Sequence, residues 1–365
     1  MRPVDLSDLQ EGMRLAKAIY APDGRLLLGK GVKLTPAVIQ RLRQLEVLVV
    51  YIEDEYIGTL EVEEVISESL QQQSIRIIKE CAEKIRGNQK LNIKLVTDIV
   101  NQILDDIGSS PTLVVLNDIR TKSTHLYNHS VSVCVLAILT GIAMGYDQLR
   151  LKLLGTGALL HDIGKGTLDE AILNNSNERS ASEEAVYREH PTAGFELIRT
   201  YGELSLLVAH TAFQHHERFD GSGYPRGLKG EEIHPFGKIT AVADTFDNLV
   251  SPLNPAKRLY PHQALQQMVA EAGKAFDPQI LKVFCKVIAP YPVGSTVQLS
   301  TGDIGVVVHV DPEHPARPKV KLISNKFGII IHKFPVVDLK TRPQIFIQDV
   351  LTEKQRPRLK VNNCN

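Results

Sequence analysis

The sequence predicts a mainly α-helical protein, in which a helical bundle is flanked by a small α+β module at the N-terminus and a small β-barrel or sheet at the C-terminus. Two observations carry this prediction. Apolar residues recur at helical spacing from about residue 60 to 290, and the period changes to two after residue 291. The chain has 365 residues, 43% of them hydrophobic and 23% charged, which suits two or three globular domains.

Residues 1–58 are predicted to form the α+β module. The stretch GMRLAKAIYAPDGRLLLGKGVKL holds two β-capable runs around a turn signal at residues 22–24. A helix should then begin with Thr35 as its N-cap and Pro36 at its first position. We interpret the module as a packing or dimerisation unit, with a sensor for a small ligand as the alternative.

Residues 60–110 are free of proline and helical in period, so we expect connecting helices there. A narrow apolar stripe is formed by Ile75, Ile78, Ala82 and Ile85. Such a stripe predicts either a homodimer, through pairing with a second copy, or packing against the chain's own helices.

The helical pattern continues through residues 112–290, interrupted by polar loops. Its most apolar segment, residues 131–144, is shorter than the roughly 20 residues that a membrane span needs. We therefore expect a buried core helix and no membrane association.

Residues 291–345 are predicted to form the β region, with turn signals at residues 300–302 and 312–318. This region holds no concentration of groups suited to catalysis. Residues 346–365 are expected to be a polar tail.

Composition limits the location and the partners. Lys plus Arg and Asp plus Glu number 42 each, so the net charge gives no reason to expect duplex nucleic acid as a partner. The four cysteines are scattered without any CxxC pair, which argues against disulfides and thiolate metal sites. With no targeting segment in the acidic first residues, a cytoplasmic location is expected.

The candidate chemistry lies among the histidines of residues 112–290. In LLHDIGKG, His161 and Asp162 follow an apolar helical run. Adjacent side chains on a helix point about 100° apart, so these two suit two ions lying across a helix end, with the carboxylate bridging. On the preceding predicted helix His125 and His129 share one face.

Further histidines and carboxylates follow. They are His190, His215 and His216, and then Asp244 and Asp247, three apart on one helical face. Each residue alone has an ordinary structural explanation. Together they form a nitrogen and oxygen ligand set without sulfur, which indicates a hydrolytic site with two ions of Fe, Mn, Co or Zn.

The order of these residues, with the strings HDIGK and HHERFDGSGYP, resembles the HD-GYP family, a branch of the HD-domain metal-dependent phosphohydrolases. The resemblance covers residues 112–290 and implies an all-helical HD-type bundle. The flanking regions are more weakly similar to those found around this domain in bacterial signalling proteins.

The resemblance implies that the chain is a phosphodiesterase that opens cyclic di-GMP to linear pGpG, GMP or both through a metal-activated hydroxide. Two divalent ions, iron or manganese before other metals, would be bound by His129, His161, Asp162, His190, His215, His216 and Asp244. His161, Asp162 and Lys165 would be catalytic. The substrate contacts would be Lys165, Tyr224, Asp247 and Arg258.

Three departures from the family pattern leave questions open. His125 stands where three-metal members carry a glutamate, so two metals are expected and a third is left open, with His125 as its candidate ligand. Residues 251–261 replace a short TSxRPYK-like string, and Arg258 is the best match for its arginine. The loop after HDIGK lacks the usual basic residue near Asn174 and Asn175.

Two alternatives to the cyclic di-GMP phosphodiesterase remain. One is a catalytically weak module that binds a nucleotide or a protein and transmits a signal. The other is a hydrolase of a different nucleotide, such as cyclic GMP-AMP. The intact ligand set favours an enzyme, and the altered segment around Arg258 keeps the alternatives open.

Overall fold

The computed structural model describes residues 1–21, 25–47, 49–54, 64–108, 121–173, 179–331 and 333–357. The turn predicted at residues 22–24 and the loop positions Asn174 and Asn175 lie outside the described residues. The chain divides into two compact units. One comprises Met1–Ala21, Leu26–Glu63 and Ala289–Asn365, and the other comprises Glu64–Ile288 together with Pro22–Arg25.

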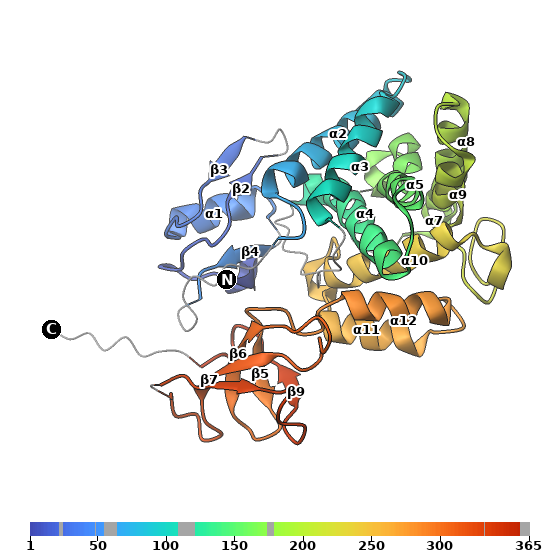
Figure 1. Cartoon of the computed structure of the whole chain (residues 1–365). Coiled ribbons are helices and arrows are strands. Elements are labelled where there is room, and N and C mark those ends of the chain that lie inside the picture. Colours follow the sequence, from blue (N-terminus) through green and yellow to red (C-terminus); the bar gives the residue numbers. More distant parts are fainter. Residues whose placement is uncertain are drawn as a thin grey trace. The chain divides into compact units, whose positions relative to one another are not determined.

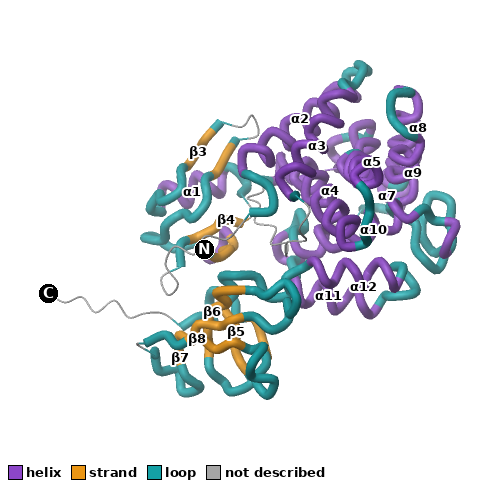
Figure 2. Tube along the Cα trace, viewed as in Figure 1, coloured by secondary structure: helices purple, strands orange, loops and turns teal. Residues whose placement is uncertain are grey.

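The first unit contains all the strands of the described residues, as Figure 2 shows. Its N-terminal elements are β1 (Arg2–Asp5), η1 (Leu6–Asp8), β2 (Ile19–Tyr20), β3 (Leu26–Leu28), α1 (Pro36–Gln44) and β4 (Val49–Ile52). Helix α1 begins as predicted, because the Thr35 side chain accepts a hydrogen bond from the Val38 amide and Pro36 stands in the first turn. Strands β1 and β4 pair antiparallel, as do β2 and β3.

The C-terminal part of the first unit is one antiparallel sheet of five strands in the order β8-β7-β6-β5-β9. The strands are β5 (Thr296–Leu299), β6 (Ile304–His309), β7 (Lys319–Ser324), β8 (Val336–Asp338) and β9 (Ile347–Val350). Of the two predicted alternatives, barrel or sheet, the structure has the open sheet, since β8 and β9 are its edges. Strand β9 pairs with β5 and lies beyond residue 345, where we expected the β region to end.

The second unit is helical, which confirms the mainly α fold class (Figure 1). Its elements in chain order are α2 (Glu68–Arg86), α3 (Ile93–Ile107), η2 (Lys122–Thr124), α4 (His125–Ala143), α5 (Gln148–Leu159), η3 (Ile163–Thr167), α6 (Glu170–Leu173), α7 (Ala181–Tyr187), α8 (His190–Tyr201), α9 (Leu206–Gln214), η4 (Gly230–Glu232), α10 (Pro235–Val250), η5 (Pro255–Lys257), α11 (Pro261–Ala270) and α12 (Pro278–Val287).

Helix α4 is the core of this unit. It contacts α2, α3, α5, α10 and α12, and every residue from Tyr127 to Gly141 is buried. The segment Lys122–Ala143 is long and apolar enough to cross a membrane by length and composition, but 83% of its most apolar window is buried inside the fold. A helix that is apolar all round is expected at such a central position.

The apolar stripe on α2 packs inside the second unit. Its four residues, Ile75, Ile78, Ala82 and Ile85, are between 4% and 9% exposed and belong to the core that α2 forms with α3 and α4. Packing against the chain's own helices is thus the alternative that the structure shows for this stripe.

Candidate metal centre

Three histidines are oriented by the same backbone contact. The Nδ1 atoms of His161, His190 and His215 donate to the carbonyl oxygens three residues earlier, at 2.7, 2.6 and 2.8 Å. A carbonyl oxygen can only accept, so Nδ1 carries the proton and each Nε2 presents a lone pair. This is the tautomer that metal-bound histidines adopt when the other ring nitrogen is held by a carbonyl.

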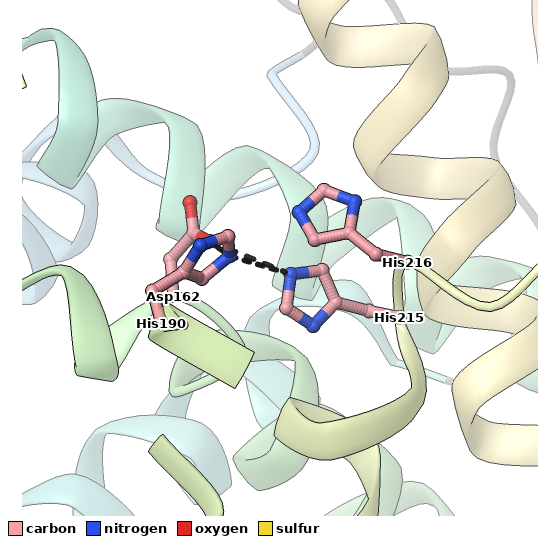
Figure 3. A group of neighbouring side chains, drawn as sticks. All are labelled: Asp162, His190, His215 and His216. Carbon is pink, nitrogen blue, oxygen red and sulfur yellow. Dashed lines mark hydrogen bonds and ion pairs between the residues drawn. The ribbon is translucent and has the colours of Figure 1, made fainter. Parts of the chain in front are cut away.

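The three Nε2 atoms face Asp162. Asp162 Oδ1 lies 3.4 Å from Nε2 of His190 and 3.5 Å from Nε2 of His215, and Oδ2 lies 3.3 Å from Nε2 of His161. The Nε2 atoms of His190 and His215 are themselves 3.4 Å apart. Figure 3 shows Asp162, His190, His215 and His216 converging from three different parts of the chain.

Several of these atoms lack a partner. His161 Nε2, Asp162 Oδ1 and His216 Nε2 are buried and have no hydrogen-bond partner among the described residues. Lone pairs facing a carboxylate in a buried site repel one another unless a cation lies between them. The donor set therefore fits divalent metal ions.

Two groups of donor atoms share Asp162. One consists of Asp162, His190, His215 and His216, and the other of His129, His161 and Asp162, with donor atoms within 4.8 Å of one another in each. Asp244 lies beside the second group, since its Oδ1 is 3.0 Å from His129 Nε2. The seven predicted ligands are thus brought together, and the two groups that share Asp162 could each hold a divalent ion.

The other predicted site residues differ in their contacts with this centre. Asp247 is fully buried and accepts from Nδ1 of His129 at 2.6 Å, and Lys165 Nζ lies 2.5 Å from Asp162 Oδ2. Tyr224 stacks on His216 with ring centroids 4.7 Å apart. His125 belongs to neither donor group, and its Nε2 lies 2.8 Å from the carbonyl oxygen of Ser251.

Burial and neighbouring charges keep most ligands in their metal-binding protonation state. Burial lowers the pKa of His190 to about 4, and it lowers the pKa of His161 and His216 as well, so these rings are neutral at pH 7. Burial alone would raise the pKa of Asp162, but His161 and Lys165 outweigh it and hold that pKa well below its usual value. His129 is the exception, because its hydrogen bonds to Asp244 and Asp247 outweigh burial and raise its pKa to about 9.

A cavity of about 410 Å³ adjoins the centre, since its lining includes the predicted ligand His129 and Lys165, which pairs with Asp162. This volume is typical of a small-molecule pocket. Of the predicted substrate contacts only Lys165 lines it. Arg258 does not, and its Nε instead donates to the carbonyl oxygen of Val250 at 3.1 Å.

Sequence reasoning missed three side chains that line this cavity: Arg86, Arg179 and Tyr187. Arg86 ends a helix that precedes the histidine motifs, and Arg179 and Tyr187 lie in a segment without a recognisable motif. The only feature of the sequence that could have pointed to Tyr187 is its position three residues before His190.

Comparison with known proteins identifies two regions of the chain. Residues 114–280 match the family model described as HD domain, and residues 296–359 match a KOW domain associated with HD domain. The chain is 32% identical over 255 residues to a cyclic di-GMP phosphodiesterase of Pseudomonas aeruginosa, covering 70% of this chain and 61% of the relative. It is 36% identical over 176 residues to a cyclic di-GMP phosphodiesterase of Thermotoga maritima, covering 48% and 47%.

A third relative has a different named substrate. The chain is 30% identical over 200 residues to a 3'3'-cGAMP-specific phosphodiesterase of Vibrio cholerae, covering 53% of this chain and 37% of the relative. Among solved structures, the HDG"Y"P protein Bd1817 of Bdellovibrio bacteriovorus matches with a TM-score of 0.49 and 17% identity, covering 77% of this chain and 97% of that one. The chain spans between 37% and 61% of the length of the three relatives.

Proposed function

Residues 114–280 belong to the HD domain family, in its HD-GYP branch, and on that premise we propose that the protein is a metal-dependent phosphodiesterase that hydrolyses cyclic di-GMP to pGpG, GMP or both. The observation that carries the proposal is the convergence of three histidine Nε2 lone pairs on the buried Asp162. A hydrolase centre needs such donors, whereas a protein that merely binds nucleotides does not.

We assign the seven converging residues as ligands of two divalent ions, iron or manganese. They are His129, His161, Asp162, His190, His215, His216 and Asp244. When bound, two such ions supply a water of lowered pKa and offset charge on the phosphate oxygens. His125 is held at the Ser251 carbonyl, which favours two ions over three.

The chain's own residues orient the ligands and the substrate. The three carbonyl acceptors fix the rings of His161, His190 and His215, and Asp247 does the same for His129. Lys165, which lines the cavity, neutralises a phosphate oxygen and stays protonated, because Asp162 outweighs burial and raises its pKa. Water attacks phosphorus, the bond to one ribose oxygen breaks, and that oxygen takes up a proton.

We propose a cytoplasmic enzyme whose partner is cyclic di-GMP rather than duplex nucleic acid or a membrane. Support comes from the balanced charge, the scattered cysteines and the burial of the apolar segment Lys122–Ala143.

The experiment is turnover of cyclic di-GMP by the purified protein reconstituted with Mn²⁺ or Fe²⁺, beside an Asp162→Asn variant. We expect metal-dependent formation of pGpG or GMP in the wild-type protein only. Binding without turnover by fully metallated protein would refute the enzyme and favour the signalling module.

Cyclic GMP-AMP is the second candidate substrate. It is favoured by the position of Arg258, which is tied to the Val250 carbonyl and does not line the cavity. The substrate contact that the family resemblance predicts for Arg258 is therefore not available in the same form. The preference for one base of the cyclic dinucleotide over another can differ accordingly. Ratios of kcat/KM for the two cyclic dinucleotides decide between them.

A further inference from the structure

The cavity beside the metal centre is strongly basic. Among the described residues, five cationic side chains and one carboxylate line it: Arg86, Lys122, Lys165, Arg179 and Lys257, with Glu170. They come from α2, η2, η3, the segment before α7, η5 and α6, so the charge is concentrated by the fold and not by any run in the sequence. An electropositive cavity of this kind attracts a ligand with more than one negative charge.

One of these cations is held in an unusual setting. The guanidinium carbon of Arg179 lies 3.7 Å from the centroid of the Tyr187 ring, and Lys165 Nζ lies 5.2 Å from the same centroid. Tyr187 also packs against His190, with ring centroids 4.9 Å apart. The ring thereby links Arg179 to Lys165 and to the metal centre through direct contacts.

Arg179 has unused hydrogen-bonding capacity. Its Nε is buried and has no hydrogen-bond partner among the described residues, and its Nη1 lies 3.7 Å from Glu184, a loose ion pair. A buried guanidinium nitrogen without an acceptor costs free energy that an anionic oxygen would recover. This observation points to a ligand and is independent of the overall charge of the cavity.

Arg86 also lines this cavity. Its Nη1 pairs with Glu170 Oε1 at 2.7 Å, and the two side chains are 34% and 68% exposed. Such an exposed pair contributes little and exchanges readily for a phosphate, which an arginine binds with two parallel hydrogen bonds. Arg86 stands outside residues 114–280, so the helix before the HD domain would contribute to substrate binding.

We propose that Arg179, stacked on Tyr187, and Arg86 form a second phosphate subsite, which binds the phosphate of the cyclic dinucleotide that is not being cleaved. This inference rests on the proposed function. Lys165 and the metal centre hold the scissile phosphate. The second phosphate of the ring then lies toward Arg179 and Arg86. The subsite supplies basic groups that the sequence lacks near Asn174 and Asn175.

The test compares substrates with two phosphates and with one. Arg179→Gln and Arg86→Gln are each expected to raise KM for cyclic di-GMP about ten- to a hundredfold, with a smaller change in kcat. The kcat/KM for bis(4-nitrophenyl) phosphate, which has one phosphate, should fall much less. The matched control is Arg199→Gln, since Arg199 pairs with Glu196 on the exposed face of α8 and does not line the cavity.

Two further variants separate binding from folding. Tyr187→Leu removes the ring that supports Arg179 and should reproduce the KM effect, whereas Tyr187→Phe keeps the ring and should raise KM much less. Glu170→Gln removes the acid that competes for Arg86 and should lower KM about two- to threefold. A rise in KM for Glu170→Gln would show that the pair is structural and would overturn the role of Arg86.

The outcomes for the subsite and for the proposed function are distinguishable. Equal losses on both substrates in the Gln variants, or an unchanged KM for cyclic di-GMP, would overturn the second subsite while leaving the phosphodiesterase intact. Calorimetric binding of cyclic di-GMP to the protein with its metals removed gives a readout that needs no turnover, and there too the Gln variants should bind at least about tenfold more weakly.

Discussion

At the scale of single residues, the sequence predicted which side chains meet but not how each one is oriented. The combined set of histidines and carboxylates, and the family resemblance, indicated that His161, His190 and His215 share a site. Their common backbone contact, from Nδ1 to a carbonyl three residues earlier, appears only in the structure because it depends on local backbone geometry. That contact decides which nitrogen faces Asp162.

Asp162 is predicted to be indispensable for metal binding. Asp162→Asn removes the negative charge that both donor groups share, so we expect metal content and turnover each to fall about a hundredfold or more. The check is elemental analysis of the purified variant beside its rate with cyclic di-GMP. Asp147→Asn is the control, since Asp147 is an exposed N-cap on α5 and asparagine caps a helix equally well. A variant that keeps its metal would contradict the assignment of Asp162 as a ligand common to both donor groups.

The pKa of His190 predicts how the metal-free protein responds to acid. Burial lowers this pKa to about 4 in the folded state, against an ordinary value of 6.5. Between pH 6.5 and about pH 4, His190 is therefore protonated in the unfolded chain but not in the folded chain. As the pH falls through this range, the free energy of unfolding decreases.

Melting temperatures of chelator-treated protein between pH 7.5 and roughly pH 4.5 test this acid dependence. His190→Asn should show a flatter decline than the wild-type protein, because the titrating group is gone. His314→Asn is the control, since that histidine is exposed and lies in the other unit. Parallel curves for the wild-type protein and His190→Asn would refute the role of His190.

At the scale of elements, most boundaries in the second unit follow from the sequence. The apolar run before His161 forms α5 as predicted, and Pro191 stands in the first turn of α8. The cavity was not predictable in the same way. Its walls include Arg86 and Arg179, which are far apart in the sequence and carry no motif, and only the tertiary fold, in which α2 packs against η3, brings them to one cavity.

Gly164 allows η3 to approach α8 closely. A Cβ at this position would overlap with the carbonyl oxygen of His190 and with the amide nitrogen of Gly194. Neither backbone atom can move without displacing the His190 ring. We therefore expect Gly164→Ala to lower the free energy of unfolding by about 3 kcal/mol and to reduce metal content as well.

Urea denaturation and metal analysis of Gly164→Ala provide the measurement. The matched control is Gly87→Ala at the end of α2, where the nearest atom to a new Cβ would be the Glu83 carbonyl oxygen at 3.5 Å, an ordinary contact. If both variants are equally stable, the close approach of η3 to α8 does not constrain the metal centre.

At the scale of the whole molecule, the first unit joins segments that are distant in the sequence. Residues 1–21, 26–63 and 289–365 form one compact unit, while residues 64–288 form the other. Local periodicity identified an N-terminal α+β module and a C-terminal β region separately. It could not show that they belong to one unit, because the contacts between them span about 300 residues.

The centre of these contacts is Asp54, which is 2% exposed. It accepts a hydrogen bond from Arg356 Nη2 at 2.7 Å and lies 3.7 Å from Arg2 Nε. Arg2 also pairs with Glu353, and Arg356 donates to the Thr296 hydroxyl at 3.0 Å. Strand β1, the end of β4 and the segment after β9 are thus connected by one buried ionic network.

We expect Asp54→Asn to destabilise the first unit by about 3–5 kcal/mol, because it leaves two buried guanidinium groups with too little negative charge around them. Chemical denaturation followed by a label in the first unit measures the change, with Asp349→Asn on the exposed surface of β9 as the control. The metal ligands belong to the other unit, so metal content should stay at the wild-type level. A variant as stable as Asp349→Asn would mean that the network contributes little, and that apolar packing alone holds the two ends of the chain in one unit.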